Sequence, residues 1–184
     1  MSLAHQNIEA LVASCKQKDQ KAEFEIYNRY SKAMYNVAYR IVKDEHYAED
    51  VMQEGFLRAF MKIHDYKQEV AFGAWLKRIV INHSIDFYKK QKNLQYRDFE
   101  EVLFKIEDTG GSEFEMDFQN LRVEQVLHAI QNLKDNYRMV LTLFFIEGYD
   151  QEEITEILNI SYANCRTTIS RAKESLRKAL TEMN

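Results

Sequence analysis

The sequence of 184 residues contains no proline and only five glycines. Average usage would give roughly nine prolines and thirteen glycines in a chain of this length. All-β folds need frequent Gly/Pro turns and strands with a two-residue alternation, and the sequence has neither. Because so few residues interrupt helices, the sequence predicts an all-α fold built from long helices.

Cysteine is also scarce. Cys15 and Cys165 stand far apart, without a CxxC pair or a histidine cluster, so neither a zinc site nor a disulfide framework is indicated. We expect both to be reduced, buried thiols. The sequence has no apolar run of membrane-spanning length and no early signal-peptide pattern. It therefore predicts a cytoplasmic protein without stable membrane association.

No catalytic or cofactor centre is indicated by the residue pattern. The five histidines are scattered, and no lysine follows a glycine-rich phosphate loop. No convergent set of nucleophile, base and metal ligands is visible. The nearest pairing, His83 with Asp86, fits a hydrogen bond on a helix surface. We therefore predict no enzyme activity, no cofactor and no metal.

Charge is distributed unevenly along a chain that is otherwise globular in composition, with 46% apolar and 29% charged residues. The net charge of -4 argues against a protein that coats nucleic acid indiscriminately. Residues 77–97 nevertheless hold six basic residues against one acidic, and residues 160–184 hold five against two. Two separate basic helical surfaces are expected.

Between the basic segments, residues 98–117 hold eight acidic residues against one basic, together with Gly110-Gly111-Ser112. This composition is typical of a linker. The sequence therefore predicts two small helical domains, residues 1–95 and 119–184, joined by a flexible acidic linker over residues 96–118.

The first domain is predicted to contain four helices. Apolar residues recur at helical spacing, and Asp44 can cap the third helix. Phe24 in the second helix and Leu57 in the third are expected among the core residues. The expected helices are a weak one near 8–16, then 21–43, a third that begins after Asp44, and a long one over 72–92.

The second domain has the pattern of a helix-turn-helix domain of four helices. An apolar pattern begins at Leu121, and an apolar helix over 139–146 is expected to end at Gly148. Asp150 and Glu153 form a capping box for residues 151–158. Asn159 then supplies a turn, and Ser161 can cap a last, basic helix. Two short helices, such a turn and a basic second helix are what a helix-turn-helix requires.

Three blocks in the chain match a known sequence pattern in the same order. They are YAEDVMQEGFLRAFMKI (47–63), FGAWLKRIVINHSIDFYKKQK (72–92) and EGYDQEEITEILNISYANCRTTISRAKESLRKAL (147–180). They resemble the extracytoplasmic-function (ECF) sigma factors, the small two-domain group of bacterial RNA polymerase sigma subunits. The resemblance runs from Glu23 to Leu180 and covers nearly the whole chain. It implies that residues 1–95 are sigma domain two and residues 119–184 sigma domain four.

The first block carries carboxylates and an amide at spacings of three and four, so they share one helical face. By itself this pattern is also typical of a solvated acidic face. The resemblance implies that this face binds the β′ coiled coil of core RNA polymerase. The polymerase-binding residues are then Asp50, Gln53, Glu54 and Arg58.

The second block and the polar break before it are implied to recognise and melt the minus-ten promoter element. Tyr66 would stack on a flipped base, Lys67 would hold the adjacent phosphate, and the Asn82 amide would read a base edge. The alternatives are an ordinary loop and an amide that caps a buried backbone group. Basic residues expected to contact phosphates are Lys77, Arg78, Lys89, Lys90 and Lys92. Trp75 is expected in the core.

The third block is implied to bind the minus-thirty-five element in the major groove, with the β flap of polymerase as a further contact. Arg166 can pair with guanine, Asn164 with adenine, and Thr167 or Thr168 with a thymine methyl. Arg171 and Lys173 fit phosphate contacts. The alternative is an exposed basic helix end. The full expected set is Ser161, Tyr162, Asn164, Arg166, Thr167, Thr168, Ser170, Arg171 and Lys173.

Some residues depart from the family pattern. Lys134, Thr155 and Asn159 replace a usual proline, alanine and glycine in turns and packing positions. In the third block, Ala163-Asn164-Cys165 stands for the family's GTV, and Thr168 replaces an arginine. We therefore expect the promoter sequence read by this chain to be unusual.

The resemblance predicts a sigma factor whose partners are core polymerase, promoter DNA and, as a candidate inhibitor, an anti-sigma factor. The modest net charge suggests weak DNA binding by the free chain, with its domains closed on each other or held by an inhibitor. The alternatives are a conventional helix-turn-helix regulator that binds duplex operator alone, and a helical adaptor that contacts only proteins.

Overall fold

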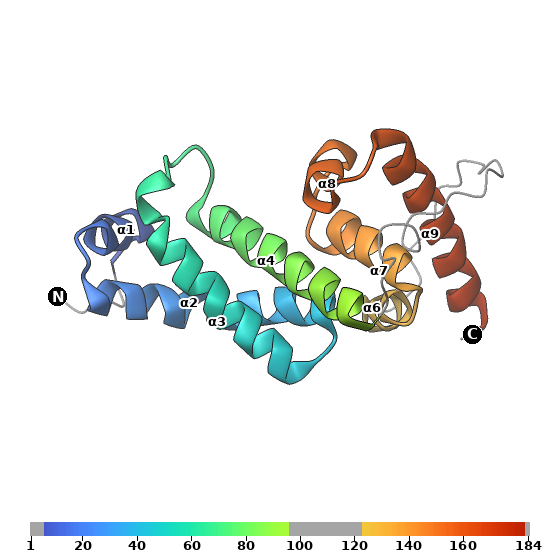
Figure 1. The fold of residues 1–184 in the computed structure, drawn as a ribbon, viewed down its shortest axis with the longest axis horizontal. Coiled ribbons are helices and arrows are strands. Elements are labelled where there is room, and N and C mark those ends of the chain that lie inside the picture. The colour runs from blue at the N-terminus through green and yellow to red at the C-terminus, as the bar shows by residue number, and fades with distance from the viewer. Residues whose placement is uncertain (1–5, 96–122, 183–184) are drawn as a thin grey trace. The chain divides into compact units, whose positions relative to one another are not determined.

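A computed structural model describes residues 6–95 and 123–182 of the chain. These residues are largely helical and contain no strand, which confirms the predicted all-α class (Figure 1). The chain divides into two compact units, residues 1–91 and 92–184, and each is considered by itself. The predicted linker 96–118 and Leu121 lie outside the described residues. No helix in the described ranges is long and apolar enough to cross a membrane.

Within the described residues 6–95, the chain forms the four helices predicted for the first domain and a short 3-10 turn. α1 packs beside α2, α2 packs along α3, and the 3-10 turn η2 lies between α1 and α3 (Figure 1). The elements are α1 (Ile8–Lys16), α2 (Gln20–Val42), α3 (Glu45–Met61), η2 (Ile63–Asp65) and α4 (Phe72–Gln95).

Local sequence explains how α2 gives way to α3. Lys43 takes the left-handed conformation with φ 59° and ends α2. Asp44 then caps α3, because its side chain accepts a 2.9 Å hydrogen bond from the backbone N–H of Tyr47. The predicted cap at Asp44 is confirmed, and the reversal lays α3 back along α2.

α3 and α4 approach closely at Gly55. A Cβ on this residue would lie 2.8 Å from Cγ2 of Val80 on α4, so only glycine allows the observed spacing.

The predicted core was wrong at two positions, because Phe24 is 67% exposed and Leu57 is 62% exposed. Their helices turn other residues, such as Ile26 and Phe56, into the interior. Cys15 and Cys165 are free and buried, as expected.

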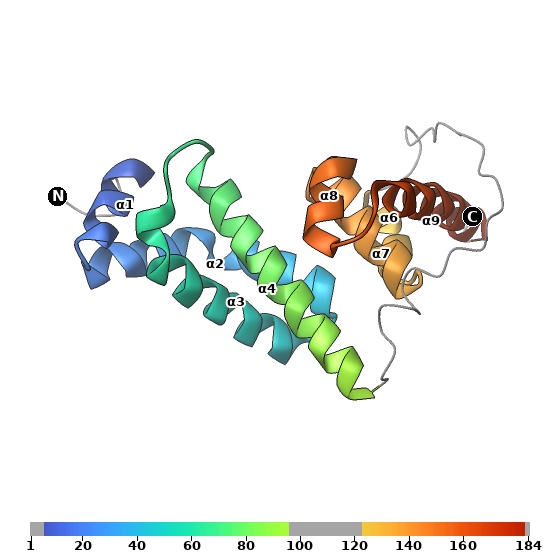
Figure 2. The same ribbon diagram turned by 45° about the horizontal axis from the view of Figure 1, so that its top comes forward.

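In the described part of the second unit, residues 123–182, α9 packs against α6, α7 and α8. Figure 2 shows the tight turn by which α8 leads into α9. The elements are α6 (Val123–Gln131), α7 (Asp135–Leu141), η3 (Thr142–Ile146), α8 (Gln151–Leu158) and α9 (Tyr162–Glu182).

The helix expected over 139–146 begins earlier and changes its winding. α7 starts at Asp135, and η3 is a π-helix. The N–H of Glu147 bonds to the carbonyl of Thr142, five residues back, at 3.0 Å, and that of Tyr149 bonds to Leu143 at 3.0 Å. Gly148 has φ 79°. The wider turns satisfy the terminal carbonyls, and Gly148 supplies the left-handed geometry that ends the segment.

The predicted helix-turn-helix signals are confirmed. Asp150 and Glu153 form the capping box of α8, with bonds of 2.8 and 2.9 Å. Asn159 ends α8 in the left-handed conformation, with φ 56° and ψ 54°. Ser161 then accepts a 3.2 Å bond at Oγ from the N–H of Asn164 and begins α9.

Candidate functional sites

The outward side of α3 is the first candidate site. The four residues predicted there, Asp50, Gln53, Glu54 and Arg58, are all exposed. Leu57 and Met61 lie on the same side, one and two turns beyond Glu54, and are 62% and 82% exposed. We call these six residues the α3 face. Sequence reasoning placed Leu57 in the core and did not single out Met61. Their spacing of three and seven residues from Glu54 was the signal that assigns them to this charged side.

The α3 face is connected to α4 through Glu54. Oε2 of Glu54 lies 2.8 Å from Nε2 of His83, which is buried. The approach is off the line of the ring N–H, so neither ring nitrogen has an aligned hydrogen bond. Burial lowers the pKa of His83, and the positive charge of Arg58 lowers it further. The predicted bond between His83 and Asp86 is thus replaced by a contact between two helices.

Tyr66, predicted as the base-stacking ring, lies in an aromatic cluster. Its side chain is 7% exposed, with ring centroids of Phe72 and Trp75 at 5.4 and 5.2 Å. Its hydroxyl donates a 2.7 Å bond to the carbonyl of Val70. In this conformation the aromatic cluster covers the Tyr66 ring, and the base-stacking role of Tyr66 stays a prediction. The residues after it, 67–71, are exposed, and Trp75 is half-buried.

α4 presents a polar side that includes Asn82. Asn82, Asp86 and Lys90 follow one another at four-residue spacing and are exposed, and Arg78 and Lys89 are half-buried. The Asn82 amide therefore lies on the surface, which is the geometry that base contact requires and that a buried cap does not have. Cations near it on the same helix provide positive potential for a phosphate backbone.

The start of α9 is the third candidate site. Tyr162, Ala163 and Arg166 are exposed, and Asn164 and Thr167 are half-buried. The hydroxyl of Thr167 donates a 2.9 Å bond to the carbonyl of Ala163. The helix-turn-helix geometry puts this first turn at the end that enters a major groove.

Thr168 is not on this outer surface. It is 5% exposed and lies on the inner side of α9, which also holds Cys165 and Ile169. The predicted placement of Thr168 off the apolar face is therefore wrong, because the side chain faces the core. Of the two threonines predicted to reach a thymine methyl, Thr167 is the more exposed. The hydroxyl of Thr168 donates a 3.2 Å bond to Oδ1 of Asn164.

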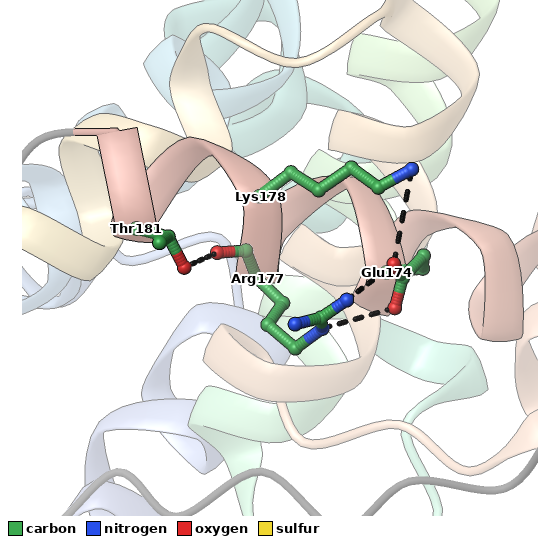
Figure 3. Close-up of polar contacts among 4 residues, drawn as sticks. All are labelled: Glu174, Arg177, Lys178 and Thr181. Carbon is green, nitrogen blue, oxygen red and sulfur yellow. Dashed lines mark hydrogen bonds and ion pairs between the residues drawn. The ribbon is translucent and has the colours of Figure 1, made fainter.

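Further along α9, Lys173, Arg177 and Lys178 contact side chains of the same unit. The Lys173 ammonium lies 4.9 Å from the Phe144 ring centroid and 5.5 Å from that of Phe145. Figure 3 shows Arg177 and Lys178 directed at Glu174, with shortest distances of 2.6 and 3.8 Å. The bond from Arg177 lowers the pKa of the Glu174 carboxyl. The outer cation nearest the start of α9 is Arg166.

Two family models match the two units. Residues 26–94 match Sigma-70 region 2, and residues 123–176 match Sigma-70 region 4. The first match contains the α3 face and most of α4, and the second contains the helix-turn-helix.

Relatives and solved structures agree with these matches. The chain is 31% identical to the ECF RNA polymerase sigma factor SigW of Bacillus subtilis, over 96% of this chain and 98% of SigW. It is 34% identical to SigM of the same organism, over 83% and 91%. The fold resembles that of CnrH, solved in complex with the cytosolic domain of CnrY, with TM-score 0.56 and 23% identity over 95% of this chain and 97% of CnrH. The chain belongs to the ECF family of RNA polymerase sigma factors.

Proposed function

We propose that this sigma factor, which directs RNA polymerase to promoters, binds core polymerase through the α3 face. The observation that carries this proposal is the pair Leu57 and Met61, exposed apolar side chains surrounded by charged and amide groups. An apolar centre with a polar rim is the usual anatomy of a protein interface. The rim of Asp50, Glu54 and Arg58 would steer the partner and fix its register. In the family this face meets the β′ coiled coil, and domain four meets the β flap.

α4 and residues 64–71 form the proposed minus-ten site. The exposed Asn82 amide can both donate to and accept from the edge of an unstacked base. Lys67, Lys77, Arg78, Lys89 and Lys90 are the proposed phosphate contacts. A base stacks on Tyr66 only after the ring leaves Phe72 and Trp75 and its hydroxyl releases Val70. Stacking and hydrogen bonds, about 1 to 3 kcal/mol per stacked base, would then offset the cost of strand opening.

The start of α9 forms the proposed minus-thirty-five site. Arg166 reaches guanine, and Tyr162, Ser161, Thr167 and Ser170 lie near the backbone and base edges. Arg171 and Lys173 hold phosphates, which for Lys173 requires that its ammonium leave the rings of Phe144 and Phe145. Backbone contacts fix position and base contacts specify sequence.

The proposed role needs no catalytic centre in this chain, since bond formation belongs to core polymerase. Its place of action is the cytoplasm, where core polymerase and promoter DNA meet. An anti-sigma factor is a proposed partner, because the similar CnrH was solved with CnrY and a second similar sigma factor, RpoE of Bartonella quintana, with the anti-sigma factor NepR.

The test measures binding to core polymerase at low salt and promoter-directed transcription by the reconstituted enzyme. Replacing both Leu57 and Met61 by Ser should weaken polymerase binding at least tenfold. Truncating a central apolar contact of an interface costs about 1 kcal/mol or more, and about 1.4 kcal/mol corresponds to a tenfold change in Kd. Val123→Ser, which removes an exposed apolar side chain of the second unit, is the matched control and should bind normally. Failure of the natural chain to bind core polymerase would contradict the proposal.

A further inference from the structure

We propose that Thr168 is a positioning residue that turns the amide of Asn164 so that it presents its NH₂ donors, and not its carbonyl oxygen, to the base it faces. This rests on the proposed contact between the start of α9 and DNA. It goes further by stating which kind of base edge Asn164 reads, and it gives a role to the residue that replaces the family's arginine.

The three threonines of α9 use their hydroxyls differently. Thr167 donates to the carbonyl of Ala163 at 2.9 Å, and Thr181 donates to that of Arg177 at 2.9 Å (Figure 3). Both are the ordinary bonds of a helical threonine to the backbone four residues earlier. Thr168 donates instead to a side chain, Oδ1 of Asn164, at 3.2 Å.

Burial makes this bond decisive for the amide. Thr168 is buried on the same side of α9 as Cys165 and Ile169. Water therefore competes little for its hydroxyl, although 3.2 Å is long for an O–H···O bond. A buried hydroxyl without an acceptor is destabilising. If the amide were turned round, its NH₂ group would face the hydroxyl and the hydroxyl proton would lose this acceptor. The observed bond therefore holds the amide with its carbonyl oxygen toward Thr168.

The backbone at Asn164 is fixed as well. Its N–H donates to Oγ of the capping Ser161 at 3.2 Å, and its side chain is half-buried at the edge of the outer surface. The bond to buried Thr168 uses one of the two lone pairs of the carbonyl oxygen and turns this oxygen toward the inner side of α9. The NH₂ group, on the opposite side of the amide, is then the part directed away from Thr168.

An asparagine that offers only its NH₂ group reads a different base edge from an asparagine that uses its whole amide. The usual bidentate contact of asparagine with adenine uses the carbonyl oxygen on N6–H and the NH₂ group on N7. An NH₂ group alone pairs with acceptors: N7 and O6 of guanine, O4 of thymine, or N7 of adenine. On adenine it makes only one of the two usual bonds, because the N6 amino group then lacks the asparagine oxygen. The base facing Asn164 should therefore be guanine, which offers two acceptors, or thymine, in preference to the adenine expected from the residue type alone.

The experiment selects promoters from a library randomised around minus thirty-five, using core polymerase reconstituted with the full chain. Asn164→Ala identifies the facing position as the one where base preference disappears. The natural chain and Thr168→Ser, which keeps the hydroxyl, should prefer guanine or thymine there. Thr168→Val, which keeps the shape and removes the hydroxyl, should reduce this preference at least fivefold and raise the share of adenine.

A second variant does not disturb the buried side of α9. Asn164→Asp keeps an acceptor for Thr168 but presents no donor, so the preference should move to cytosine, whose N4 amino group donates. Thermal unfolding of all variants establishes that each is folded.

The outcomes separate this inference from the proposed function. Adenine preference in the natural chain, or an unchanged preference in a folded Thr168→Val, would overturn the inference while α9 still bound DNA. The inference is also overturned if Asn164→Ala alters no position while Arg166→Ala alters one. Absence of any minus-thirty-five selectivity in the natural chain would overturn the proposed function and the inference with it.

Discussion

At the scale of single residues, His83 should make stability depend on pH. It is buried against Glu54, and burial with the nearby Arg58 lowers the pKa of the imidazole below 6.5, while Glu54 and Asp86 oppose the shift. Between the folded-state pKa and 6.5, the unfolded chain binds more protons than the folded one. The contribution of neutral His83 to the free energy of unfolding is therefore complete above pH 6.5. It is lost as the pH falls from 6.5 through the lowered pKa of the folded state.

The measurement is urea unfolding of the full chain at pH 7.5 and pH 5.5. The natural chain should lose more free energy of unfolding on acidification than His83→Gln, because glutamine does not titrate. His64→Gln, at an exposed histidine, is the matched control and should keep the natural pH dependence. Equal losses in the natural chain and His83→Gln would contradict the assigned burial effect.

Residue-level prediction from sequence succeeded where a neighbour a few positions away decides the structure. Asp44, Glu153 and Ser161 cap helices through hydrogen bonds to residues three positions away. A short sequence pattern is therefore enough to predict these caps. The burial of Tyr66 and Thr168 was not predicted. For Tyr66 it depends on contacts with Phe72 and Trp75, which lie outside the short pattern, and for Thr168 on a rotation of about one residue around the helix. The shared exposed side of Asp50 and Glu54 followed from spacing, but their binding role stays a prediction.

At the scale of helices, the close approach of α3 and α4 at Gly55 should be intolerant of a methyl group. Gly55→Ala would gain about 0.5 to 1 kcal/mol from the loss of glycine's backbone freedom. It would also put Cβ 2.8 Å from Cγ2 of the buried Val80, and overpacking costs about 1 to 3 kcal/mol. The branched Val80 side chain cannot swing away. We expect net destabilisation of about 1 kcal/mol.

A double-mutant cycle checks this cause. Val80→Ala removes the obstructing methyl group, so the two substitutions together should destabilise less than the sum of each alone, by about 0.5 kcal/mol or more. Gln53→Ala, at an exposed site in the same helix, should leave stability nearly unchanged. An additive cycle in urea unfolding would show that the α3–α4 spacing adjusts freely.

Helix existence was predictable because few residues interrupt the apolar periodicity, and the helices of the first unit lie where the pattern put them. The π-helix η3 was not predictable from the sequence. An apolar segment such as residues 142–146 has the same composition whether its backbone hydrogen bonds span four residues or five. The wider winding is decided by which carbonyls Glu147 and Tyr149 can reach. Gly148 was recognised as an end signal in either case.

At the scale of the whole molecule, charge segregation along the sequence indicated two domains, and the chain divides into two compact units. The predicted domain limits, 1–95 and 119–184, stay a prediction, because the acidic segment between them lies outside the described residues. Each unit has its own buried apolar set. Ile26, Phe56 and Leu76 are fully buried or nearly so in the first unit, as are Leu143 and Ile154 in the second.

Because each unit buries a core of its own, the two predicted domains should fold as separate fragments. Fragment 1–95 should be helical by circular dichroism, unfold in one cooperative transition, and compete with the full chain for core polymerase, since it carries the α3 face. Fragment 119–184 should also be helical but closer to the limit of stability, because a smaller chain buries a smaller fraction of its surface. Leu57→Ser with Met61→Ser in fragment 1–95 should abolish competition without unfolding it. An unfolded 1–95 fragment would mean that its core is completed by residues beyond the predicted boundary.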